Sequence, residues 1–133
     1  MNEILSISID VTSGVLSLSE ISETLQISPS ATSHEKGSKR GSANMWSETI
    51  FRYEVQLISG ETLTTVLVKT FMLLTDNLFF ERVKLIKEQA EVVLDIAYAV
   101  SDASCSILIP AEILASVAAA GMNLEVTCYV TGD

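Results

Sequence analysis

Residues 5–10 read Leu-Ser-Ile-Ser-Ile-Asp, in which apolar and polar side chains strictly alternate. In an extended strand, side chains that alternate in this way point to opposite faces, so the pattern predicts a half-buried β-strand. A helix is expected soon after it, because Ser17 and Glu20 have the spacing of a capping box. Ile21 and Leu25 then fall on one face of that helix. The N-terminal segment therefore predicts a strand followed by a short amphipathic helix.

The same two periods recur along the rest of the chain. Alternating apolar residues predict further strands over residues 51–57, 94–100, 105–109 and 124–130. Thr62 and Asp76 are placed to cap two successive helices. Pro110 suits the first turn of a last helix, and Gly121 suits its C-terminal stop.

These elements predict an α+β domain with the order β-α-β-α-α-β-β-α-β. The natural arrangement is a single mixed or antiparallel sheet of about five strands with helices packed over one face. The length of 133 residues suits a single domain over residues 1–133. The Gly- and Ser-rich stretch at about 30–44 is expected to be an exposed, flexible loop within it.

Composition excludes several classes of protein. Apolar residues make up 48% of the chain and charged residues 19%, as in ordinary globular domains. No apolar run reaches the roughly 18 residues that a membrane helix needs, and no basic segment precedes an apolar one at the N-terminus. Cys105 and Cys128 lie in apolar stretches. A disulfide between them is conceivable, but two buried reduced thiols are favoured, and the expected location is the cytoplasm.

The net charge of −9 is unevenly distributed. All eight basic residues fall between Lys36 and Lys87, so both ends of the chain are purely acidic. Nucleic acid is a poor partner for such a surface, because binding it requires clustered cations. A basic protein would be favoured as a partner, although the acidity could also serve solubility alone.

The sequence lacks the residue sets of common catalytic sites. His34 is the only histidine, and it falls in the polar loop, where a fixed hydrogen-bonded geometry is hard to hold. One histidine and two distant cysteines do not have the spacing of metal ligands. We therefore expect no catalytic residue, metal or cofactor, and no enzymatic activity.

The loop also carries a small basic cluster, which could bind an anion. Its members are His34, Lys36, Lys39 and Arg40. The glycines that flank them do not follow the order of a phosphate-binding loop. Trp46 follows the cluster, and it either fills one end of the core or serves as a binding hot spot.

Several short motifs resemble a small bacterial family of domains of unknown function, number 4279. They are the helix and turn over residues 18–30, the His-Glu-Lys-Gly loop at 34–37, the Trp-Ser-Glu at 46–48, the helix over 109–121 and the strand over 124–130. The resemblance implies an α+β domain from a bacterium. It implies no established activity and no catalytic residue.

Two functions remain open. The first is a non-enzymatic inhibitor, an immunity protein that binds and neutralises a bacterial toxin such as a basic nuclease. The second is a domain that binds a small molecule or anion through the basic loop, and a structural or regulatory role is a further alternative. For the inhibitor, the acidic terminal segments and aromatic anchors would contact the partner, which selects Glu20, Glu23, Trp46, Glu125 and Tyr129.

Overall fold

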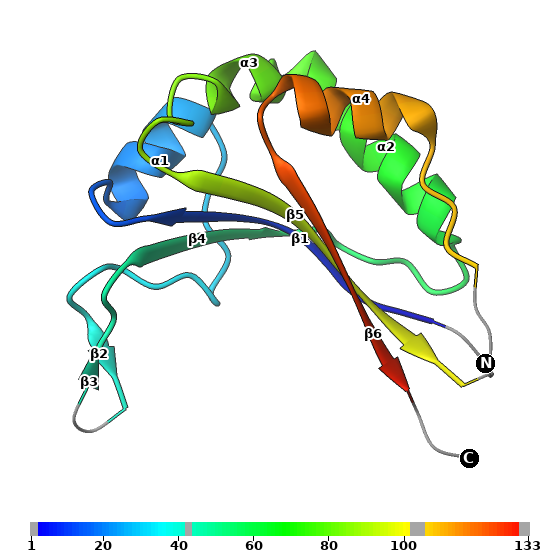
Figure 1. The fold of residues 1–133 in the computed structure, drawn as a ribbon, viewed down its shortest axis with the longest axis horizontal. Coiled ribbons are helices and arrows are strands. Elements are labelled where there is room, and N and C mark those ends of the chain that lie inside the picture. The colour runs from blue at the N-terminus through cyan, green and yellow to red at the C-terminus, as the bar shows by residue number, and fades with distance from the viewer. Residues whose placement is uncertain (1–2, 42–43, 102–105, 131–133) are drawn as a thin grey trace.

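Four helices cover one face of a four-stranded sheet, and a small hairpin projects away from it (Figure 1). This describes residues 3–41, 44–101 and 106–130 of the computed structural model. The strands of the sheet are β1 (Glu3–Ser13), β4 (Thr49–Glu54), β5 (Glu91–Val100) and β6 (Asn123–Val130). The helices are α1 (Leu18–Leu25), α2 (Leu63–Asp76), α3 (Phe79–Val83) and α4 (Ala111–Ala119), and the hairpin consists of β2 (Lys39–Arg40) and β3 (Asn44–Met45).

The sheet is mixed, with the strand order β4-β1-β5-β6. β1 runs antiparallel to both β4 and β5, whereas β5 and β6 are parallel. The parallel pair requires a crossover, and α4 supplies it. β1 and β6, the first and last strands of the chain, therefore lie on either side of β5 and do not pair with each other.

The core lies between the sheet and the helices. Ile7, Ile9 and Val11 of β1 point into it, and so do Leu94 and Ile96 of β5. The helices contribute their apolar faces to the same cluster, through Ile21, Leu25, Leu67, Leu74, Phe79, Val83, Ile113 and Val117. The predicted α+β class, with its helices on one face, is confirmed.

The capping box of α1 is present as predicted. The Ser17 hydroxyl accepts a hydrogen bond from the Glu20 backbone N–H at 3.1 Å, and the Glu20 carboxylate accepts one from the Ser17 backbone N–H at 2.9 Å. We expect Ser17→Ala to lower the free energy of unfolding by about 1 kcal/mol, because a helix N–H loses its partner. Urea unfolding measures the change, and Ser19→Ala in the same turn, where Ser19 is exposed, should leave the midpoint unchanged.

Two expected elements differ in the structure. Residues 106–109 form no strand: the Thr64 hydroxyl donates to the Leu108 carbonyl at 3.2 Å, and Ile107 and Ile109 pack against the core. Their alternation reflects one buried side of a connecting segment, so the sheet has four strands in the described ranges where about five were expected. Cys105 lies outside those ranges.

Asp76 does not cap α3, because it is the last residue of α2. Leu78, in the left-handed region at φ 58°, precedes α3 directly and offers no side-chain cap. The N-cap position of α3 is thus held by a leucine, whose side chain has no oxygen to accept a hydrogen bond from the helix.

The burial predicted for Cys128 is also wrong, since its free thiol is exposed. Figure 1 shows the reason: the second half of β6 extends beyond the helices that cover its beginning. An apolar alternation at the end of an edge strand therefore does not guarantee burial. The prediction for Cys105 stays untested.

The predicted loop at 30–44 is exposed, but its described part is not without regular structure. Residue His34 pairs with Ile50 in an isolated β-bridge, and the hairpin of β2 and β3 follows. The Glu35 carboxylate accepts hydrogen bonds from the Leu18 N–H and, at 3.0 Å, from the Thr49 hydroxyl. These bonds tie the base of the segment to α1 and β4, while its flexibility stays a prediction.

Candidate functional site

The face of the sheet opposite the helices is rich in acidic side chains. We call it the open face. Paired residues in a sheet share a face, so the register assigns its members. The charged ones are Glu3, Asp10, Arg52, Glu54, Glu91, Asp95 and Glu125.

Two rows of paired residues cross the middle of the open face. One row runs Glu54, Ser8, Asp95, Glu125 over all four strands. Asp10 lies in the neighbouring row, where it pairs with Arg52. Directly opposed side chains in adjacent strands lie within about 4.5–5.5 Å of one another at their Cβ atoms, so Asp95 and Glu125 are neighbours, with Asp10 beside them. Glu54 stands at the other end of the row, where its carboxylate accepts a hydrogen bond from the Thr32 hydroxyl at 3.3 Å.

Arg52 is the only cation among the described residues of the open face, and it is already paired. Its Nε lies 3.0 Å from Oδ1 of Asp10, and the Ser8 hydroxyl donates to the same oxygen at 2.9 Å. The Asp10 side chain is only 14% exposed. The guanidinium therefore pairs with the Asp10 carboxylate, and the remaining carboxylates leave the open face with a surplus of negative charge.

The surplus of negative charge affects the pKa of Asp95. Its pKa is raised above the ordinary value of 3.8, first by desolvation and then by the charges of Asp10 and Glu125. A hydrogen bond to Asp10 raises it further, and Arg52 opposes the shift. Burial and the neighbouring carboxylates therefore disfavour the ionised form of Asp95.

The raised pKa predicts that Asp95→Asn stabilises the domain at pH 7. The folded state binds the proton more tightly than the unfolded chain, so stability falls as pH rises through the raised pKa. Below the unfolded value both states are protonated and the cost is absent. Asparagine imitates the neutral form at every pH, and its amide can still donate to Asp10.

Thermal unfolding from pH 7 down to about pH 4 measures this effect. Asp95→Asn should melt above the wild type at pH 7, and the difference should shrink towards the acidic end. Glu91→Gln, which removes the same charge at the exposed end of β5, is the matched control. A gain that is equal for both variants, or independent of pH, would contradict the crowding of Asp10 and Asp95.

One end of the open face adds apolar surface to the acidic cluster. Tyr129 pairs with Ala99, which pairs with Glu3. Tyr129 itself is 54% exposed. An aromatic side chain beside a charged surface can supply the anchor that long-range attraction alone lacks.

The structure separates the residues that the sequence proposed for partner binding. Glu125 and Tyr129 lie together on the open face. Glu20 and Glu23 lie on α1, in the helical layer on the other side of the sheet. The Glu20 carboxylate is also engaged in the capping box. The acids of the two chain ends thus form two surfaces, and only the strand residues share one.

Trp46 is placed in neither of these surfaces. It lies in the projecting segment next to β3, half-buried and outside the core cluster, so it does not fill the core. The His34 ring stacks on it with centroids 4.1 Å apart, and the Arg40 guanidinium lies 4.8 Å from its ring centre. Stacking and cation–π contacts hold these three side chains together and stabilise the projecting segment.

The residues of the predicted anion site do not all converge. His34 and Arg40 meet at Trp46, but the Lys36 ammonium donates to the Gly14 carbonyl at 2.7 Å. Lys39 is exposed on β2. The Glu35 carboxylate, which caps the start of α1, lies within the same segment. The geometry does not favour this cluster as a binding site for an anion.

Five residues of the central cluster were not selected as site residues from the sequence: Ser8, Asp10, Arg52, Glu54 and Asp95. Each occupies a polar position in an alternating strand, which is the only signal that could have identified them. Pairing between strands distant in sequence brings them together. The described residues contain no group of His, Cys, Asp and Glu arranged to hold a metal ion, and none of their helices is long and apolar enough to cross a membrane.

Comparison with known proteins adds a family but no activity. The model of a family described as a domain of unknown function (DUF4279) matches residues 3–131. The resemblance drawn from short motifs is thereby confirmed over almost the whole chain. No curated protein and no solved structure matches it.

Proposed function

Since the chain belongs to the DUF4279 family of domains of unknown function, its activity has to be inferred from its surfaces, and we propose that it is a non-enzymatic inhibitor of a cationic bacterial toxin domain. The open face is the contact surface. The observation that carries the proposal is the row of acids Glu54, Asp95 and Glu125 across this face, where Arg52, the only cation among its described residues, is already paired with Asp10.

Electrostatics gives this surface a specific role in recognition. A face with many carboxylates and a single, neutralised arginine attracts a basic protein over a distance of about 8–10 Å in physiological salt. Such steering raises association rates by roughly 10- to 1,000-fold. Exposed ion pairs add only about 0–1 kcal/mol each to affinity, so tight binding depends on Tyr129 as an anchor.

A toxin domain fits this chemistry because its nucleic-acid-binding surface has to be basic, which matches the expectation of a nuclease. The inhibitor would cover that surface with its own carboxylates, and no catalytic group is needed for the task. The site of action would be the cytoplasm of the producing cell, where the toxin is made.

The test pairs the purified domain with the toxin domain that the neighbouring gene is expected to encode. We expect a stable complex, loss of the toxin's activity, and shifts of backbone amide resonances concentrated in β1, β5 and β6. A neighbouring gene without such a domain, or a product that does not bind, would contradict the proposal. If binding shifts the amide resonances of the helical layer alone, the domain would still be an inhibitor, but the open face would be refuted as its contact surface.

A further inference from the structure

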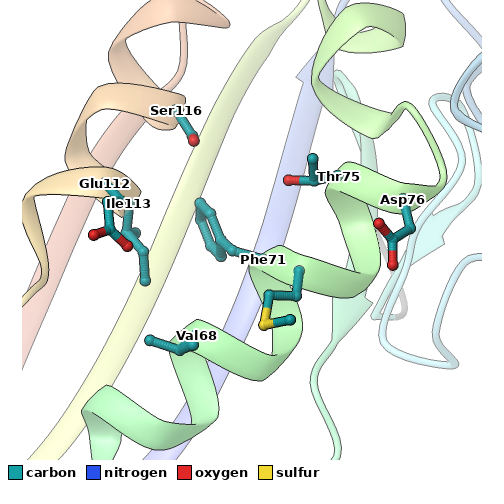
Figure 2. Close-up of a pocket in the computed structure, with 8 residues that line it drawn as sticks. Val68, Phe71, Thr75, Asp76, Glu112, Ile113 and Ser116 are labelled. Atoms are coloured by element: carbon teal, nitrogen blue, oxygen red, sulfur yellow. The ribbon is translucent and has the colours of Figure 1, made fainter.

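A groove of about 240 Å³ lies between α2 and α4, in the helical layer on the other side of the sheet. Phe71 and Ile113 form its floor, and both are almost fully buried. Figure 2 shows the Phe71 ring directed from α2 towards α4, with Ile113 of α4 across from it. Val68 and Met72 add apolar walls.

The residues that α2 contributes follow the spacing of one helix face. They are Val68, Phe71, Met72, Thr75 and Asp76, at i, i+3, i+4, i+7 and i+8. Eight residues of helix span about 12 Å. The groove is therefore elongated and matches about two turns of a second helix laid along it.

The rim of the groove is acidic. Glu112 of α4 and Asp76 of α2 stand on opposite sides of it (Figure 2), and none of the described residues that line it is basic. The ion pairs in the described part of the chain, Arg52 with Asp10 and Lys69 with Glu61, involve neither carboxylate. Apolar floor and acidic flanks together specify a ligand that is apolar in the middle and cationic at its edges.

We propose that this groove docks an amphipathic α-helix of another protein, with apolar anchors at helical spacing and lysine or arginine flanking them. The anchors would lie over Phe71 and Ile113, and the cations would face Asp76 and Glu112. This is the helix-in-groove mode of recognition, in which residues at i, i+3 or i+4, and i+7 of the bound helix make the contacts. Exposed Met72 suits it, because methionine adapts to different anchors.

Charge and size favour this occupant over others. The groove is smaller than the roughly 300–1,000 Å³ of pockets that enclose a small molecule. Nucleic acid and anionic lipid would be repelled by its rim. A second copy of this chain, with a net charge of −9, would also be repelled. The groove faces away from the open face, so its ligand is distinct from the toxin surface discussed above.

The probe is a synthetic alanine-based helical peptide with leucines at i, i+4 and i+7 and two lysines at each end of that stripe. Fluorescence anisotropy measures its binding to the full chain, and a peptide with glutamates in place of the lysines measures the contribution of charge. We expect the lysine peptide to bind at least about 10-fold more tightly than the glutamate peptide. Asp76→Asn combined with Glu112→Gln should remove most of that difference.

The matched variants are Met72→Gln, which changes a wall of the groove, and Leu73→Gln on the neighbouring face of α2. Both side chains are well exposed, at 63% and 55%, so neither change should unfold the domain. We expect Met72→Gln to weaken the lysine peptide roughly 10-fold and Leu73→Gln to leave its affinity unchanged. The open-face variant Glu54→Lys/Glu125→Lys should bind the peptide as the wild type does.

Three outcomes would overturn the inference. The first is no binding of the lysine peptide at millimolar concentration. The second is an equal loss of its affinity in Met72→Gln and Leu73→Gln, and the third is equal affinity of the wild type for the lysine and glutamate peptides. Sedimentation at rising protein concentration covers the remaining alternative: a dimer that Met72→Gln abolishes would identify a second copy as the occupant. None of these results depends on the toxin-binding function, and failure of that function leaves them unchanged.

Discussion

Replacing Leu94 by alanine is expected to lower the free energy of unfolding by about 2–5 kcal/mol. Leu94 lies in β5, is 1% exposed, and points into the core beneath the helices. Alanine removes the buried methyl groups and leaves a cavity that the surrounding strands and helices cannot fully close. Urea unfolding should show a lower midpoint with an unchanged slope.

The same strand offers a matched pair that tests the two faces of the sheet. Val92 points into the core, whereas Val93 lies on the open face and is only half-buried. We expect Val92→Ala to cost roughly 1–3 kcal/mol and Val93→Ala less than about 1 kcal/mol. Equal losses would mean that something covers the face we describe as open, and the account of its function would lose its basis.

The second large effect concerns association with a cationic partner. Glu54→Lys together with Glu125→Lys places two cations in the row that contains Asp95. We expect the association rate at low salt to fall by roughly 10- to 100-fold, since the local potential that attracts the partner is cancelled. The fold should survive, because both glutamates are exposed, and an unchanged melting temperature checks this.

The control makes the same change in net charge on the other side of the molecule. Glu23 of α1 and Glu81 of α3 are exposed in the helical layer. Reversing both to lysine should slow association only slightly, because its effect is long-range and screened by salt. A similar loss in both double variants would show that total charge, and not the open face, controls association.

Local patterns in the sequence predicted the elements that depend on neighbouring residues. The capping box at Ser17 and the caps at Thr62 and Gly121 act over three or four residues, and all three occur in the structure. The strands over 5–10 and 94–100 were identified because one of their faces packs against the core. Caps depend on residues three or four apart, and one-sided burial produces an alternating pattern, so both can be recognised from the local sequence.

The failures share a different cause. Ile107 and Ile109 alternate like a strand because one side of their segment packs against the core, yet they lie in no ladder of the described sheet. Cys128 alternates correctly but is exposed, because the second half of β6 extends beyond the helices. The local sequence does not show how far the layer of helices extends over a strand, or whether a segment finds another strand to pair with.

The candidate site shows the same limit. The sequence indicated acidic chain ends and selected Glu125 and Tyr129, which the structure places on the open face. It could not place Asp95 between Ser8 and Glu125, because that row depends on which strands become neighbours. It also combined Glu20 and Glu23 with these residues, although α1 lies on the opposite side of the sheet.

The most direct test of the open face as the partner surface is the salt dependence of association with the toxin domain. Stopped-flow mixing would record the rate for the wild type, Glu54→Lys/Glu125→Lys and Glu23→Lys/Glu81→Lys from about 20 to 500 mM salt, a range over which the screening length falls severalfold. We predict a steep decline for the wild type and the helical-layer variant, and a slow, nearly salt-independent rate for the open-face variant. Three parallel curves, or a wild-type rate indifferent to salt, would contradict the account.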